Sequence, residues 1–124
     1  MTKFLLPASI MIACFACSKN DTPVNKAPVV KLNSPKSNEV FDPGQPIVIN
    51  ATITDDGDLG EIHVHVHNAD TDEELIHDHE IPATQSYTLN KSFVAQSGLK
   101  YSIEVEADDL AGHVTSVEVN VSTR

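Results

Sequence analysis

The chain has 124 residues and a formal net charge of −10, with 18 acidic residues against 8 basic ones. This length suits a single domain, and the acidic excess argues against binding nucleic-acid phosphates or an anionic membrane surface, because both attract clustered Lys and Arg. With no Trp, 4 Phe and 2 Tyr, the core must be largely aliphatic.

The first residues form a targeting segment. Lys3 supplies a positive start, and the apolar run Phe4 to Ala16 is too short to span a bilayer. A small residue directly before Cys17 resembles the bacterial lipobox, whose cysteine is acylated and becomes the new N-terminus. Cys14 is a competing acylation site, standing where a lipobox usually has Leu. We predict a lipoprotein signal peptide at residues 1–16 with Cys17 acylated; an ordinary secretory signal is the alternative.

The polar segment at residues 17–27 reads as a flexible tether. Its start, "CSKND", resembles the signal that sends some lipoproteins to the outer face of the outer membrane, with Asp21 supplying the acid. The resemblance implies a lipid-anchored protein of the bacterial outer membrane, exposed at the cell surface. Both cysteines precede the domain at 28–124, so that domain has no disulfide and must rest on its hydrophobic core.

From Pro28 onward, apolar and polar residues alternate with a period of two, which predicts β-strands. No segment favours a helix, and seven or eight short strands at regular spacing predict an all-β antiparallel sandwich. Val40 and Phe41 are expected to touch the core from a loop. The strands are expected at residues 29–33, 47–54, 61–68, 74–81, 86–94, 100–108 and 115–122.

Two segments carry a family resemblance. Residues 42–66, "DPGQPIVINATITDDGDLGEIHVHV", resemble strands B and C of bacterial immunoglobulin-like domains, and residues 101–121 resemble their closing F–G hairpin. His113 stands where the usual turn has Asn. The resemblance implies a single immunoglobulin-like β-sandwich, a fold that serves spacers, adhesins and carbohydrate-binding accessories alike. The chain also resembles small bacterial lipoproteins whose domain of this kind carries a His-rich hairpin, a family without an established activity.

Five of the six histidines lie within residues 61–80, at every second position of two expected strands. The apolar residues between them must face the core, so the histidines of the first strand point outward, about 7 Å apart. A single strand with this spacing cannot easily bind one ion, whereas directly opposed residues on paired strands can, since their Cβ atoms lie about 5 Å apart. The five are His63, His65, His67, His77 and His79.

The hairpin register decides whether these histidines share a face. A three-residue loop at Asp70–Asp72 pairs His65 with His77 and His63 with His79, and exposes Leu75. A loop one residue longer turns the second pair of histidines to the other face. We favour the first register, because it keeps the imidazoles out of the apolar interior.

The expected neighbour on the other side, residues 100–108, presents Glu104 and Glu106 outward. Imidazole and carboxylate together suit zinc or copper better than calcium. We therefore predict a zinc or copper site. Two alternatives are a plain solvated face and a pH-responsive face, since imidazole gains charge near pH 6. The predicted ligands are His63, His65, His77 and His79, with His67, Glu104 and Glu106 as further ligands or as acceptors that fix the imidazole tautomers.

A second cluster is acidic. In an immunoglobulin-like sandwich, the loops at 55–58 and 108–113 lie at the same end. Oxygen ligands gathered there suit calcium, although Asp and Gly are also ordinary turn residues. The candidate calcium ligands are Asp55, Asp56, Asp58, Asp108 and Asp109.

Catalysis is not indicated, because the domain lacks a Cys nucleophile and a Gly-x-Ser-x-Gly motif, and a flat sheet offers little concavity. The sequence thus favours a membrane-anchored binding protein for zinc or copper. The alternative is a structural or adhesive module that binds a protein or a glycan and is stabilised by calcium. Neither hypothesis involves nucleic acid.

Overall fold

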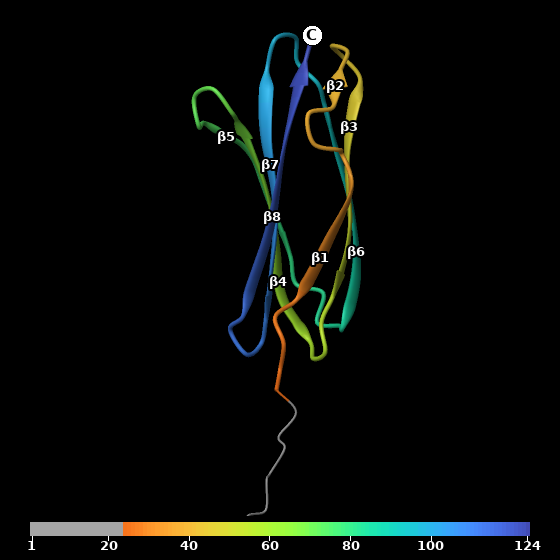
Figure 1. Cartoon of the computed structure of the whole chain (residues 1–124), viewed down its shortest axis with the longest axis vertical. Coiled ribbons are helices and arrows are strands. Elements are labelled where there is room, and N and C mark those ends of the chain that lie inside the picture. Colours follow the sequence, from red (N-terminus) through yellow and green to blue (C-terminus); the bar gives the residue numbers. More distant parts are fainter. Residues whose placement is uncertain (1–23) are drawn as a thin grey trace, which may run out of the picture.

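The computed structural model describes residues 24–124, so the predicted signal peptide and both cysteines lie outside the described residues. The described part is all-β and consists of eight strands in two stacked layers (Figure 1). It contains no helix that is long and apolar enough to cross a membrane. The strands are β1 (Val29–Ser34), β2 (Val40–Phe41), β3 (Pro46–Thr54), β4 (Leu59–Asn68), β5 (Glu74–Glu80), β6 (Ser86–Val94), β7 (Lys100–Asp109) and β8 (Val114–Thr123).

One layer is a three-stranded sheet in the order β1-β3-β6, and the other is a five-stranded sheet in the order β2-β8-β7-β4-β5. Pairing is antiparallel except between the short β2 and β8. This arrangement confirms the predicted immunoglobulin-like sandwich, and the strand bounds agree with the expected ones to within a few residues. The expected loop contact at residues 40–41 is a short strand in which Phe41 is buried and Val40 is exposed.

The core is aliphatic and follows the alternation of the sequence. Inward residues of β3, β4 and β7 are almost fully buried, which is expected because each buried aliphatic side chain stabilises the fold by about 1.5–3 kcal/mol. The residues between them face solvent or the sheet edges. The buried residues of these strands are Ile47, Ile49, Ala51, Ile53, Leu59, Ile62, Val64, Val66, Tyr101, Ile103, Val105 and Ala107.

The β4–β5 hairpin has the favoured register, with His65 opposite His77 and His63 opposite His79. The predicted three-residue loop is wrong. The Asn68 N–H donates to the Glu73 carbonyl across a four-residue turn, and the register then shifts by one residue, with His67 opposite Glu74 but Val66 opposite Ile76. The extra residue between these pairs is Leu75, which forms a β-bulge.

The end of β5 is held against the other sheet. Lys91 of β6 donates a 2.7 Å hydrogen bond to the Glu80 carboxylate, and this ion pair crosses from one layer to the other. The tip of the hairpin stands apart from the sandwich (Figure 1). The hairpin is therefore fixed at its base and exposed at its turn.

Tyr101 is 2% exposed and its ring packs edge-on against Phe93. Its hydroxyl accepts a 2.9 Å hydrogen bond from the backbone N–H of Gln96, which ties the loop before β7 to the core. This is the bond that a tyrosine corner supplies in immunoglobulin-like domains.

We expect Tyr101→Phe to lower the free energy of unfolding by about 1 kcal/mol, because the ring stays packed while the Gln96 N–H loses its acceptor. Urea unfolding followed by circular dichroism measures the change. Tyr87→Phe is the matched control, since the Tyr87 ring is partly buried against the same core while the Gln96 N–H donates to Tyr101. Equal losses in the two variants would contradict the assigned role of the Tyr101 hydroxyl.

Candidate metal centre

The histidines of β4 and β5 form one outward face. The side chains of His63, His65 and His67 are 24%, 23% and 30% exposed, and that of His77 is 46% exposed. Cross-strand pairing stacks the His65 and His77 rings with centroids 4.3 Å apart. The rings thus line a partly shielded surface rather than projecting separately into solvent.

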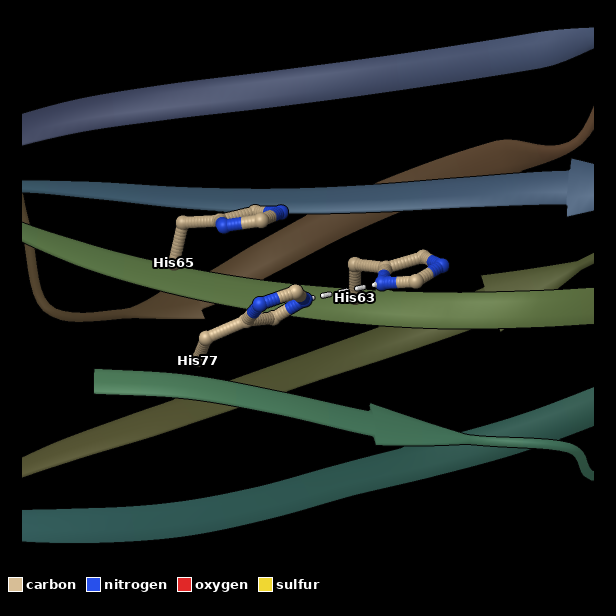
Figure 2. A group of neighbouring side chains, drawn as sticks. All are labelled: His63, His65 and His77. Carbon is tan, nitrogen blue, oxygen red and sulfur yellow. Dashed lines mark hydrogen bonds between the residues drawn. The ribbon is translucent and has the colours of Figure 1, made fainter. Parts of the chain in front are cut away.

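Three of these residues bring one ring nitrogen each within 4.8 Å of the other two: His63, His65 and His77. Figure 2 shows the His63 and His77 rings turned toward each other, with the His63 Nδ1 and His77 Nε2 atoms 3.2 Å apart. Two nitrogens bound at 2.0–2.1 Å to a tetrahedral zinc ion lie about 3.3 Å apart. This pair is therefore already at the spacing of metal ligands, and the third nitrogen is close by.

Carboxylates hold the opposite edges of these rings. The His63 Nε2–H donates to Glu61 at 2.9 Å, and the His65 Nδ1–H donates to Glu74 at 2.8 Å. Glu74 also lies 3.8 Å from the His77 Nδ1 atom. A carboxylate that accepts a hydrogen bond from one imidazole N–H leaves the other ring nitrogen unprotonated and able to bind a metal.

The electrostatics of Glu74 reflect this position. The hydrogen bond from His65 holds the pKa of the Glu74 carboxyl below its usual value, with partial desolvation opposing and the nearby His77, His65 and His67 rings adding to the lowering. Glu74 therefore keeps its negative charge among the imidazoles, which suits a cation-binding face.

A second group of three consists of His65, His67 and Glu74. The His67 Nε2 atom lies 3.9 Å from the Glu74 carboxylate. The other ring nitrogen of His67 donates to the Asp72 carbonyl at 3.3 Å, so Nε2 is the atom that faces the group. The two groups share His65.

The sequence did not indicate Glu74 as a site residue. Strict alternation along β5 puts residue 74 on the same face as Ile76, toward the core. The bulge at Leu75 shifts the register, so that Glu74 pairs with the outward His67. The only signal of this shift in the sequence is the extra residue of the hairpin. Its position in the hairpin depends on the geometry of the turn.

The other predicted ligands lie on the same face but outside these groups. His79 pairs with His63, with ring centroids 6.0 Å apart. Glu104 and Glu106 of β7 stand opposite His65 and His63, as expected. The Glu104 carboxylate accepts a hydrogen bond from the Ser116 hydroxyl on β8.

The two acidic loops do lie together, joined by the Leu110 N–H donating to the Asp58 carbonyl at 3.4 Å. Within residues 24–124, however, the groups that bring three ligand atoms within 4.8 Å are those of the hairpin. Instead, the aspartates cap backbone N–H groups: Asp55 accepts from Gly57, Asp56 from Lys26, Asp108 from Glu61 and Asp109 from His113.

Asp109 and His113 form a pair that the sequence did not predict. The Asp109 side chain is buried and accepts 2.8 Å hydrogen bonds from both the backbone N–H and the ring Nδ1–H of His113. Burial alone would raise the pKa of Asp109, but these bonds outweigh it and the pKa is lowered. His113 thus closes the turn between β7 and β8.

Comparisons with known proteins show the family and the fold. A family model described as Domain of unknown function (DUF4625) matches residues 15–122, and no curated protein matches the chain in sequence. The chain is similar to the fibronectin(III)-like modules of Clostridium thermocellum CbhA, at 28% identity and a TM-score of 0.52. The match covers 77% of this chain and 47% of that one, so the chain spans about half the length of that structure.

The chain is also similar to a β-glucosidase from Listeria innocua in complex with glucose, at 15% identity and a TM-score of 0.50. This match covers 79% of the chain but 16% of the glucosidase, and it shows the fold alone. The fibronectin(III)-like likeness agrees with the predicted immunoglobulin-like sandwich.

We expect the Asp109→Asn variant to be less stable than the wild type at pH 7, with a difference that shrinks as the pH falls. Because the folded-state pKa is lowered from the ordinary 3.8, the carboxylate stabilises the fold fully above about pH 4 and loses this effect as it is protonated at lower pH. Urea unfolding at pH 7, 4 and 3 measures the difference. Asp70→Asn is the control for an exposed aspartate, and a difference independent of pH would contradict the prediction.

Proposed function

The chain belongs to the DUF4625 family, whose description assigns no activity, and we propose that it binds a transition metal ion, zinc or copper, on the β4–β5 hairpin. The ligands are His63 Nδ1, His65 Nε2 and His77 Nε2. A fourth position is left for water or for a group of a partner molecule.

One observation carries the proposal: three imidazole nitrogens converge while carboxylates stand at the opposite ring edges. Hydrogen bonds from imidazole to carboxylate are how metal sites in proteins fix the tautomer and the orientation of their histidines. A solvated polar face needs neither the convergence nor the pairing. This is why we favour a metal site over a solvated or pH-responsive face.

The ligand chemistry selects the ion. Neutral imidazoles suit zinc and Cu(II), whereas calcium takes six to eight oxygen ligands. The site lies on the surface of a sheet, and its imidazole side chains are 23–46% exposed. Such a site loads and releases an ion readily, which fits capture or buffering of a metal better than catalysis.

The proposed location follows from the N-terminal motifs. Acylation of Cys17, or of Cys14, anchors the protein to the bacterial outer membrane, and residues 18–27 hold the domain away from the lipid. The net charge of −10 attracts cations to the domain. A surface-exposed anchor places the hairpin where metal ions arrive from outside.

We expect zinc or Cu(II) to raise the thermal midpoint of the full chain carrying Cys14→Ser and Cys17→Ser, which removes competing thiolates. At a hundredfold excess over the dissociation constant, binding adds about 2.7 kcal/mol of stability, or several degrees. His65→Ala and His77→Ala are expected to abolish the rise. A rise in the thermal midpoint that persists in both variants, or that only calcium produces, would contradict the proposed site.

We expect His79→Ala to weaken zinc binding less than His77→Ala does, because the His79 ring belongs to neither converging group. Isothermal titration calorimetry on the same cysteine-free chain compares the two dissociation constants. Equal losses would place His79 among the ligands, as the sequence alone suggested.

A second candidate function is a non-catalytic module that binds a protein or a glycan. It is supported by the likeness to fibronectin(III)-like modules. The thermal experiment distinguishes the two functions, since this one predicts no rise with zinc or copper.

A further inference from the structure

The two converging groups of the hairpin share a single residue, His65. We propose that the hairpin holds two transition-metal ions at once, bridged by the His65 ring. This inference rests on the proposed function and extends it from one ion to two.

The two edges of the His65 ring face different partners. Its Nδ1 atom lies 2.8 Å from the Glu74 carboxylate. The tip of the ring, which carries Nε2, points along β4 toward His63 and His77 (Figure 2). An ion on each nitrogen would therefore contact separate sets of further ligands.

The second ion would be bound by His65 Nδ1, His67 Nε2 and a Glu74 oxygen. His67 has no part in the first group, yet its Nε2 faces Glu74 at 3.9 Å. Its other nitrogen is held by the Asp72 carbonyl, which fixes the tautomer with Nε2 unprotonated. A second ion would therefore be bound by both His67 and Glu74, the residue that the bulge brings to this face.

The proton balance is simple. With one ion bound at Nε2, the neutral His65 ring keeps its proton on Nδ1, directed at Glu74. The second ion forms a bond to Nδ1 as the N–H bond breaks, and the proton leaves to solvent. His65 becomes an imidazolate that bonds to both ions, and one proton is released for the second ion bound.

Charge and spacing permit both ions. Bonds of about 2 Å on either side of the ring place the ions about 6 Å apart. The imidazolate between them and the Glu74 carboxylate together offset two of the four positive charges. Glu61 and Asp72 add negative charge beside the outer ligands, at 2.9 Å from His63 and 3.5 Å from His67.

The test is a Cu(II) titration of the full chain carrying Cys14→Ser and Cys17→Ser, followed by calorimetry and electron paramagnetic resonance. We expect two equivalents of Cu(II) to bind. The resonance signal should rise up to one equivalent and then fall toward zero as the second ion binds, because an imidazolate couples the two spins antiferromagnetically.

The His67→Asn variant should bind one equivalent and keep the full signal of a single Cu(II) ion. His79→Asn is the matched control on the same face and should still bind two equivalents with loss of signal. One equivalent in the parent chain would overturn the bridged pair while the proposed function stands. Two equivalents with an undiminished signal would overturn the bridge, and no binding at all would overturn both proposals.

Discussion

The structure of the hairpin depends on the burial of the apolar residues of β4. Ile62, Val64 and Val66 are at most 2% exposed and belong to the hydrophobic core of the sandwich. A slip of one residue would place three imidazoles in the core and these side chains in water. The free-energy cost of such a slip fixes the register of β4 against both β5 and β7. This register aligns the histidines in a row.

A row of histidines on one strand is not yet a site. Pairing with β5 adds His77 to this row, and the bulge at Leu75 adds a carboxylate, because the register shift turns Glu74 from the core face to the imidazole face. Glu74 then meets both His65 and His67 and completes the second group of three. The Leu75 side chain is 40% exposed, as the favoured register already predicted. Bulges are over-represented at sheet edges, and β5 is an edge strand of the five-stranded sheet.

The sequence predicted the features that depend on period-two burial. The strands, the two-layer sandwich, the outward histidines and the pairing of His65 with His77 all follow from it. It missed Glu74 and the pairing of Glu61 with His63, because these depend on the bulge and on rotamers, which alternation does not encode. It also missed the hydrogen bond from the His113 ring to Asp109. The resemblance to a turn with Asn at this position gave no reason to expect a bond from an imidazole.

The fold of this domain does not depend on the proposed metal site. Structural zinc sites commonly supply the folding energy of small domains that lack a sufficient core. Here sixteen buried hydrophobic residues form a continuous core on the inner faces, and the hairpin ligands lie on an outer face. The imidazoles are already paired with carboxylates and with one another, so an ion at the proposed site would replace existing hydrogen bonds instead of organising loose side chains. A domain that keeps its shape with or without an ion would suit the repeated uptake and release of metal that the proposed function requires.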